Sequence, residues 1–322
     1  MRIVKRRLAA IAAIVVLLML VAAATSALLA SRSASRVLLT VFVGAAKVAH
    51  GSAAAVPARS GDMLGDGDSI TTDADGKASL TYPDGSVTRL DSSTSVVVHV
   101  TQSGASLRTR LDQTAGLTWN TVKHLLGGST FQVSGPNSST AEVRGTRFGF
   151  YVEHDATGNP VIWIDVYDGT VGVKGAVGGE VLATAGQRVT VRKQAAPTKP
   201  VPIPDGDLQL SFTVFNQTIE AVAGTPSTFE SGTLSAGAST TFAFTADGTH
   251  DLQIVLGWPA LAGSTFELTV VAPDGSVFSQ TQQSLPPIIV IARKAAAGTW
   301  TVDVRDVSSS QAEPWWVIVG RS

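Results

Sequence analysis

Cysteine is absent from the 322-residue sequence. The chain therefore forms no disulfide, contains no thiolate metal ligand or cysteine nucleophile, and offers no thiol for lipidation. If the protein is exported, its hydrophobic cores alone must stabilise it, because exported proteins otherwise draw on disulfides.

Charged side chains are also scarce, at 15% of residues with a formal net charge of -1. The first 36 residues hold six of the 24 lysines and arginines and none of the 25 acidic residues, so the remainder is acidic. Outside this first segment the sequence lacks the dense basic surface that phosphate binding needs, and no nucleic-acid partner is expected.

Signatures of catalysis and of metal binding are missing as well. The five histidines have neither an HExxH nor a His-x-His spacing, so no metal site is expected; they are His50, His99, His124, His154 and His250. There is no nucleophile elbow, P-loop or dinucleotide-binding glycine pattern, and no cofactor is expected. A Ser/His/Asp triad that is assembled only in space stays open, which keeps a secreted hydrolase as a remote alternative.

The longest apolar run covers residues 8–30, where Thr25 and Ser26 are the only polar side chains. As a helix it would extend about 34 Å, enough to cross a bilayer core of about 30 Å. Lys5, Arg6 and Arg7 precede it, so the positive-inside rule places residues 1–7 in the cytoplasm and the bulk outside. We expect a single-pass signal anchor in the cell membrane; the alternative is a cleaved signal peptide and a secreted protein.

Asp-Gly pairs recur nine residues apart, at Asp66-Gly67, Asp75-Gly76 and Asp84-Gly85. Asp-Gly favours tight turns, and the segments between the pairs alternate apolar and polar residues as half-buried strands do. The spacing also resembles that of calcium-binding β-rolls, but the glycine-rich frame of those repeats is missing. The pattern therefore favours an all-β fold in which these aspartates form turns.

Strand-like alternation continues to residue 192, and residues 194–206 (QAAPTKPVPIPDG) contain four prolines. Such a segment is typical of an extended linker. Beyond it, strand-length apolar segments separated by Asp-Gly turns suit a β-sandwich. We predict an extracytoplasmic β domain at residues 37–193, a linker at 194–207 and a β-sandwich at 208–322.

Further motifs follow the Asp-Gly turns in a fixed order, namely Gly116-Leu117-Thr118-Trp119, Val143-Arg144-Gly145-Thr146-Arg147-Phe148 and Ala185-Gly186-Gln187. Over about residues 41–193 they resemble the FecR domain family. The resemblance implies a rolled or solenoid-like β domain that acts in regulation. It also implies a set of signature residues with structural roles, namely Gly67, Asp68, Asp84, Gly85, Trp119, Arg144, Gly145, Thr146 and Gly186.

The best-known members of that family receive a signal from an outer-membrane transporter and control an anti-sigma region in the cytoplasm. Here only residues 1–7 precede the apolar run, which is too short for an anti-sigma domain. We therefore expect control of a sigma factor only if a separate cytoplasmic partner exists.

The C-terminal region resembles the bacterial pre-peptidase C-terminal domain, a jelly-roll-like β-sandwich, at residues 233–242, 268–275 and 298–304. Domains of this type are accessory modules of secreted proteins. The resemblance implies attachment or binding.

Four residues are candidates for binding a partner. Arg144 and Arg147 flank Gly145-Thr146; either they pair within the fold around a tight bend, or their guanidinium groups face a carboxylate or sugar acid of a partner. Trp315 and Trp316 could stack on sugar rings or be divided between core and surface. On a strand they point to opposite faces, so we expect one of them to be exposed.

We interpret the chain as a non-catalytic, membrane-anchored extracytoplasmic protein with a regulatory, signalling or scaffold-binding role. The alternative is a carbohydrate- or peptidoglycan-binding protein of the cell envelope. An envelope protein or polysaccharide is the expected partner, and the oligomeric state stays open.

Overall fold

The computed structural model describes residues 36–123, 125, 127–143, 145–208, 211–222, 225–260 and 263–322. The predicted membrane span at residues 8–30 lies outside this part of the chain. Among the helices of the described residues, none is long and apolar enough to cross a membrane. The described residues are nearly all β-structure, as the sequence predicted.

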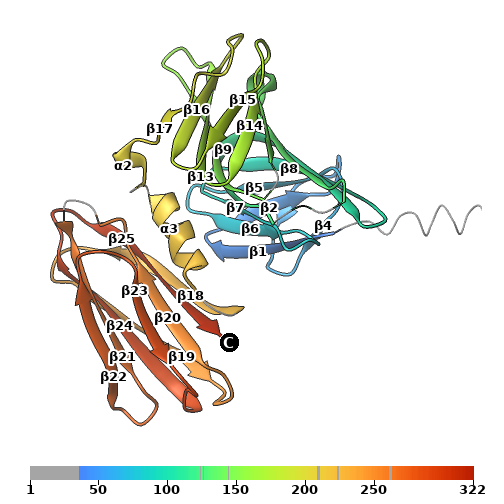
Figure 1. The fold of residues 1–322 in the computed structure, drawn as a ribbon. Coiled ribbons are helices and arrows are strands. Elements are labelled where there is room, and N and C mark those ends of the chain that lie inside the picture. The colour runs from blue at the N-terminus through green and yellow to red at the C-terminus, as the bar shows by residue number, and fades with distance from the viewer. Residues whose placement is uncertain are drawn as a thin grey trace, which may run out of the picture.

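The first β domain is one continuous seventeen-stranded sheet that forms two layers (Figure 1). Sheet A has the order β4-β1-β6-β7-β9-β12-β13-β16-β17, and sheet B has the order β3-β2-β5-β8-β9-β10-β11-β14-β15. The strands are β1 (Val37–Val43), β2 (Ala46–Ala49), β3 (Val56–Pro57), β4 (Met63–Leu64), β5 (Asp68–Thr72), β6 (Lys77–Thr81), β7 (Val87–Leu90), β8 (Ser95–Ser103), β9 (Ser106–Thr121), β10 (Thr130–Ser134), β11 (Thr140–Val143), β12 (Arg147–His154), β13 (Pro160–Asp168), β14 (Thr170–Lys174), β15 (Val181–Thr184), β16 (Gln187–Arg192) and β17 (Val201–Pro202), with a 3₁₀ turn at Pro136–Ser138.

Strand β9 belongs to both layers. Residues 106–115 pair with β8 in sheet B, and residues 116–121 pair with β12 in sheet A. Gly116 lies at the crossing with φ +77°, and a β-carbon there would lie 2.3 Å from the Thr94 hydroxyl oxygen. Only glycine fits such a crossing, which explains the glycine of the Gly-x-x-Trp motif.

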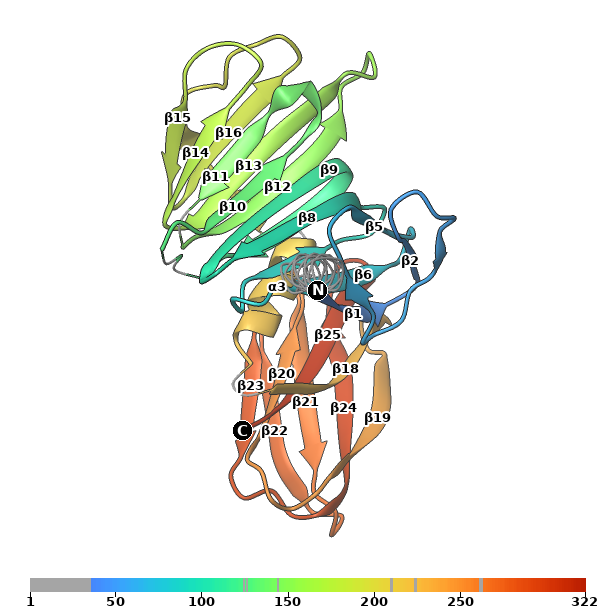
Figure 2. The same ribbon diagram turned by 90° about the vertical axis from the view of Figure 1, so that its right-hand side faces the viewer.

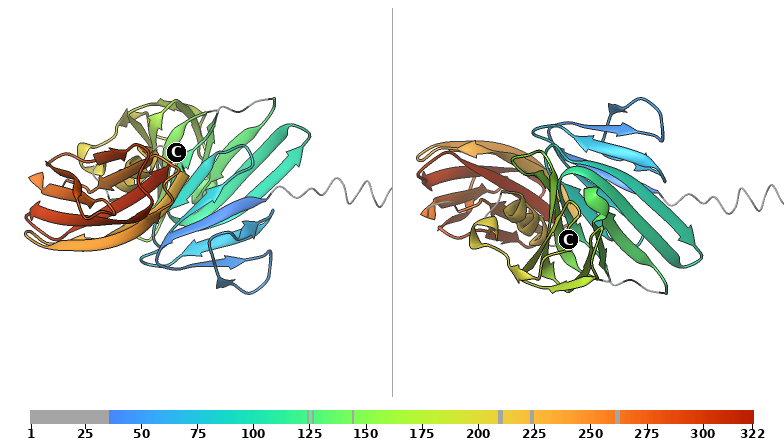
Figure 3. Two further views of the ribbon diagram at one scale, coloured as in Figure 1. Left: turned by 90° about the horizontal axis from the view of Figure 1, so that it is seen from below. Right: turned by 90° about the horizontal axis from the view of Figure 1, so that it is seen from above.

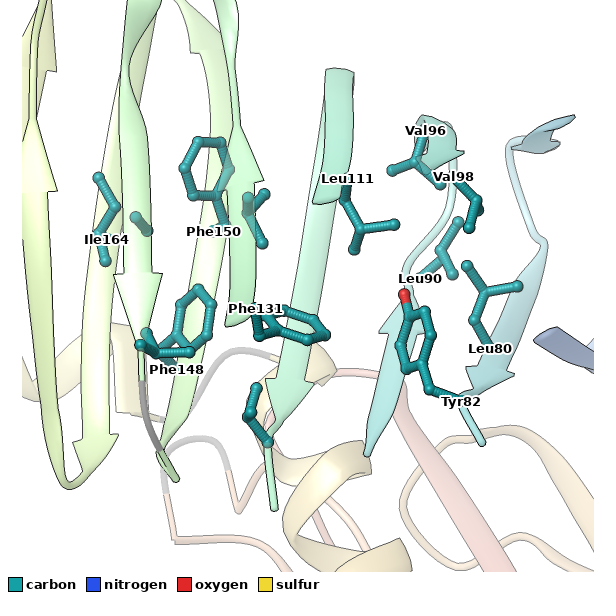
Figure 4. Close-up of a cluster of buried hydrophobic side chains, with 14 of the residues drawn as sticks. Leu80, Tyr82, Leu90, Val96, Val98, Leu111, Phe131, Phe148, Phe150 and Ile164 are labelled. Atoms are coloured by element: carbon teal, nitrogen blue, oxygen red, sulfur yellow. The ribbon is translucent and has the colours of Figure 1, made fainter. Parts of the chain in front are cut away.

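Side chains from both layers form one hydrophobic core (Figure 4). Phe131 of β10 packs edge-on against Tyr82, with ring centroids 5.5 Å apart, and against Phe148 of β12 at 6.5 Å. Burying rings of this size supplies a large share of the stability, about 2 kcal/mol for each.

The solenoid-like arrangement that the family resemblance implied is wrong for the described residues. The coils of a solenoid stack in parallel, whereas the strands here pair antiparallel except for β9 with β10. The turn at Asp84-Gly85 joins β6 and β7 into a hairpin, whereas the turns at Asp66-Gly67 and Asp75-Gly76 carry the chain from one layer to the other.

The C-terminal β domain is a sandwich of two four-stranded sheets, sheet C in the order β18-β25-β20-β23 and sheet D in the order β19-β24-β21-β22. Eight antiparallel strands in two facing sheets suit the predicted jelly-roll-like sandwich. Its core is built around Trp258, Phe266 and Trp300. The strands are β18 (Thr225–Leu234), β19 (Ser239–Ala246), β20 (Leu252–Gly257), β21 (Thr265–Val271), β22 (Val277–Gln283), β23 (Ile288–Ala292), β24 (Gly298–Ser308) and β25 (Glu313–Arg321).

Two helices that the sequence analysis did not predict join the two β domains. The proline-rich segment ends in β17, which pairs with β16, and leads into α2 (Asp205–Leu208) and α3 (Ser211–Glu220). Figures 1 and 2 show α3 between the two β domains, and Figure 3 shows the sandwich beside the first domain from below and above. Because both sides of α3 are covered, seven of its ten residues are buried, and these include the polar residues Thr213, Asn216 and Thr218.

A separate apolar cluster forms where α3 meets both sheets. Phe215 of α3 is fully buried and packs edge-on against Phe42 of β1, at 6.0 Å between ring centroids, and against Trp316 of β25 at 5.9 Å. The helix therefore bridges the outer face of sheet A and the outer face of sheet C.

Candidate functional site

A transverse row of side chains crosses the outer face of sheet A. The strand register places Ser79 of β6 beside Arg89 of β7, and Arg89 beside Trp119 of β9. The neighbouring row places Thr121 beside Arg147 of β12. Residues two apart on a strand share a face, so both rows converge on one patch.

Glu220, the last residue of α3, occupies this patch. Its Oε1 accepts hydrogen bonds from Trp119 Nε1 at 2.9 Å, the Thr121 hydroxyl at 2.7 Å and Arg89 Nη1 at 3.2 Å. Its Oε2 accepts one from Arg147 Nη1 at 3.0 Å. Trp119 of the Gly-x-x-Trp motif and Arg147, the second arginine of the VRGTR segment, thus bind the same carboxylate.

The surroundings keep Glu220 ionised. Burial opposes the charge, but the hydrogen bond from Thr121 and the charge of Arg89, with those from Trp119 and Arg147, hold the pKa of Glu220 below its ordinary value. The side chains of Glu220 and Arg89 are only 15% and 10% exposed, so solvent screens this pair weakly.

A second anchor lies near α2. Arg188 of β16 donates two hydrogen bonds of 2.6 Å to the two carboxylate oxygens of Asp165, and its Nη1 lies 2.5 Å from Asp207 of α2. The Arg188 guanidinium also lies over the Trp163 ring, 4.9 Å from its centroid. Although burial opposes its charge, the two carboxylates raise the pKa of Arg188. The segment from α2 to α3 is therefore held to sheet A at both ends.

Three aromatic side chains, Trp119, Tyr167 and Tyr151, lie between the contacts of Glu220 and those of Arg188. Trp119 stacks on Tyr167, with ring centroids 4.2 Å apart, and the Tyr167 hydroxyl lies 2.9 Å from that of Tyr151. Burial raises the pKa of Tyr167 to about 12 and the pKa of Tyr151 well above its ordinary value, so both phenols stay neutral. The rings form an apolar surface, on which the two phenol hydroxyls face each other while the Trp119 indole N–H points to Glu220.

The VRGT segment forms the bend at one edge of the patch. Gly145 has φ 73°, and the Thr146 N–H donates to Val122 O at 3.2 Å while Val122 N–H donates to Thr146 O at 2.8 Å. These backbone hydrogen bonds join the bend to the end of β9. Arg144 lies outside the described residues, and Arg147 faces Glu220 and, at 3.7 Å, Asp168.

The remaining signature residues form turns. Gly67, Gly85 and Gly186 have φ of 81°, 79° and 81°. Asp84 Oδ1 accepts a hydrogen bond from the Ser86 N–H at 2.9 Å. The Asp68 carboxylate accepts hydrogen bonds from the backbone N–H groups of Gly51 and Gly65 and pairs with His50.

Burial by itself would raise the pKa of Asp68. The hydrogen bonds from Gly65 and Gly51 and the pairing with His50 hold that pKa below its ordinary value. Within the described residues no group of three or more histidine, aspartate and glutamate side chains could hold a metal ion. Within the Asp-Gly pairs, the carboxylates of Asp66 and Asp84 accept hydrogen bonds from the backbone N–H groups of Val100 and Ser86, and the Asp84 contact is the one typical of a turn.

The prediction that one of Trp315 and Trp316 is exposed is wrong, because each is 4% exposed. They do point to opposite faces of β25. Trp315 lies in the core of the sandwich, while Trp316 lies in the cluster under α3. The helix that the sequence analysis missed covers the face that was expected to meet solvent.

Sequence reasoning also missed Arg89 and Glu220. Glu220 follows the strand-like apolar residues Phe212, Val214 and Phe215, whose spacing suits a strand as well as a helix. The available signal was that Arg89 and Arg147 both lie in strand segments of a chain with little charge. An arginine that packs within a β-sheet domain requires a carboxylate partner.

Comparisons with known proteins agree with the family resemblance. Residues 68–172 match the family model for FecR protein. A search of curated proteins found no match. Two crystal structures of candidate anti-sigma factors from Parabacteroides distasonis are 18% and 17% identical over 41% and 46% of this chain, with TM-scores of 0.33 and 0.36.

The match spans 59% and 64% of the length of those two proteins. An exo-β-1,3-galactanase from Phanerochaete chrysosporium matches over 77% of this chain and 90% of its own, at 7% identity and a TM-score of 0.23. These structural likenesses are too remote to carry a functional argument, whereas the family match and the signature motifs agree. Residues 68–172 of this chain are a FecR domain.

Proposed function

We propose that this protein is a non-catalytic, membrane-anchored extracytoplasmic module with a regulatory, signalling or scaffold-binding role. The FecR domain supports a regulatory role. The apolar run at residues 8–30 after Lys5, Arg6 and Arg7 supports a single-pass protein with its bulk outside, or a secreted one if that run is cleaved.

The contact of Glu220 with the FecR domain is the observation that carries the proposal. A regulatory domain must pass a change of state to another part of the molecule, which requires a defined contact between the two. Here Trp119 and Arg147 of the FecR segment bind a carboxylate on the helix that covers Trp316 of the sandwich. Any change in this patch would alter how the sandwich is held.

A non-catalytic role is supported by what the buried carboxylates do. Glu220 is shared by Arg89 and Arg147, and Asp165 is held by both nitrogens of one guanidinium fork. The pKa of Glu220 is held below its ordinary value, and the oxygens of both carboxylates are occupied by arginine donors, so neither is placed to act as a general base. The burial of Trp315 and Trp316 removes the observation that favoured binding of sugars.

Photo-crosslinking in native membranes tests the proposal. A photoreactive residue is placed at Leu182, which is 62% exposed on β15 of the first β domain, or at Leu285, which is 74% exposed on the sandwich. We expect mass spectrometry to find a specific envelope or membrane protein, and the pattern to change in Glu220→Gln. Capture of no protein from either site, together with retention on insoluble cell wall, would contradict the regulatory role.

A further inference from the structure

A cavity of about 500 Å³ lies where sheet A, α3 and the sandwich meet. Its walls come from β1, β6 and β7 on one side and from β18, β25 and the end of α3 on the other. Cavities of this size hold small molecules or one or two residues of a peptide, and they occur preferentially between domains.

The walls are mainly apolar. Phe42, Ile219, Phe229 and Ile318 line the cavity. The rings of Phe42 and Phe229 contact each other, with centroids 5.6 Å apart, and Phe229 is paired with Ile318 across β18 and β25. The apolar wall is therefore built by four elements, namely β1, α3, β18 and β25.

One charged side chain, Arg89, also lines the cavity. Its Nη1 contacts Asn216 at 3.4 Å and Glu220 at 3.2 Å. Within the part of the chain that the structure describes, Nε and Nη2 of Arg89 make no hydrogen bond. These guanidinium donors therefore lie unpaired beside an apolar wall.

The charge of Arg89 is compensated only in part. Glu220 is shared between Arg89 and Arg147. The second carboxylate near Arg147, Asp168, is 66% exposed and lies 3.7 Å away, so solvent weakens its contribution. Because Arg89 is buried and shares the carboxylate of Glu220 with Arg147, its surroundings favour the binding of a further anion. A carboxylate matches the guanidinium group in shape.

We propose that this cavity binds an apolar ligand that carries a carboxylate, with the carboxylate at Arg89 and the apolar group against Phe42, Ile219 and Phe229. Two sources share this chemistry: a fatty acid, and the C-terminal apolar residue of a peptide. Binding of such a ligand does not depend on the proposed regulatory role.

The test uses the full chain in nanodiscs of zwitterionic lipid, with empty nanodiscs subtracted, and calorimetric titration. The probes are octanoate with octanamide as its uncharged counterpart, and the peptide Ala-Ala-Phe with a free or an amidated C-terminus. We expect at least one of the two carboxylates to bind, with its neutral counterpart at least about tenfold weaker, the loss expected for one charged hydrogen-bonded contact. Binding of octanoate alone assigns a fatty acid, and binding of the free peptide alone assigns a C-terminus.

Two variants locate the site. Arg89→Gln removes the charge but also disturbs the contact with Glu220. Thr81→Phe fills the cavity from β6 and leaves the Glu220 contacts in place. Its control is Thr71→Phe, on an exposed position of β5 outside the cavity. We expect Thr81→Phe to abolish binding and Thr71→Phe to leave it unchanged.

If neither carboxylate binds, if the neutral counterparts bind equally well, or if Thr81→Phe binds as the unmodified protein does, the proposal is overturned. Thr81→Phe decides the question even if Arg89→Gln does not fold.

Discussion

Trp119 and Glu220 are 101 residues apart in the sequence, yet the Trp119 indole N–H donates a 2.9 Å hydrogen bond to Glu220 Oε1. The tryptophan belongs to a motif of the FecR domain, and the glutamate ends the helix that carries the sandwich. One buried carboxylate therefore couples the two β domains.

Replacing Glu220 by glutamine tests the energy of this coupling. The amide keeps the shape but leaves Arg89 and Arg147 without their shared counter-ion, and removing one partner of a buried pair costs about 3 kcal/mol. We expect the free energy of unfolding in urea to fall by about that amount. Glu230→Gln, at an exposed position of β18, is the control and should change it by less than about 0.5 kcal/mol.

The same pair predicts a dependence on pH. Because the pKa of Glu220 is lower in the folded protein, its stabilising effect is complete above the unfolded value of about 4.3 and is lost as the pH falls through the folded value. The difference in unfolding free energy between the unmodified protein and Glu220→Gln should be constant above about pH 5.5 and shrink below about pH 4. A difference that grows on acidification would show that the carboxyl is not held as an anion.

Trp316→Ala should remove the apolar support of α3. Truncating a buried tryptophan costs about 3 to 5 kcal/mol, and Trp316 is 4% exposed. Leu285→Ala, at a side chain that is 74% exposed, is the control. Thermal unfolding measures both; a Trp316→Ala protein as stable as the control would mean that α3 does not pack on sheet C.

Gly116→Ala should destabilise the FecR domain by about 2 kcal/mol or more, since it combines a positive φ with a collision against Thr94. Gly104→Ala separates the two effects. Gly104 has φ +59° but no atom within 4 Å of the added carbon, so it should cost about 1 kcal/mol. Equal losses at the two positions in urea unfolding would contradict the close crossing at Thr94.

Much of the fold followed from local chemistry. Asp-Gly turns such as Asp84-Gly85 and alternating strands such as β6 predicted the all-β class, because turn geometry and the two-residue period are properties of neighbouring residues. The family motifs predicted the FecR domain that residues 68–172 match. Trp315 and Trp316 were correctly expected on opposite faces for the same local reason.

The site itself could not be predicted, because it depends on contacts between distant residues. Sheets A and C cover both sides of α3, so the polar residues Thr213, Asn216 and Thr218 are buried with the apolar ones, and local pattern does not distinguish this short segment from a strand. Because α3 was not predicted, Trp316 had no expected cover, and Arg89 and Arg147 had no expected partner. The antiparallel pairing that replaces a solenoid likewise depends on the order of strands in space.

The absence of cysteine allows the coupling to be measured directly. Leu182→Cys on β15 of the first β domain and Leu285→Cys on the sandwich are exposed and would be the only thiols for two spin labels. We predict one narrow distribution of distances by pulsed electron spin resonance, and a broader one when Glu220→Gln is added. Identical distributions with and without Glu220→Gln would contradict the claim that this carboxylate holds the two β domains together.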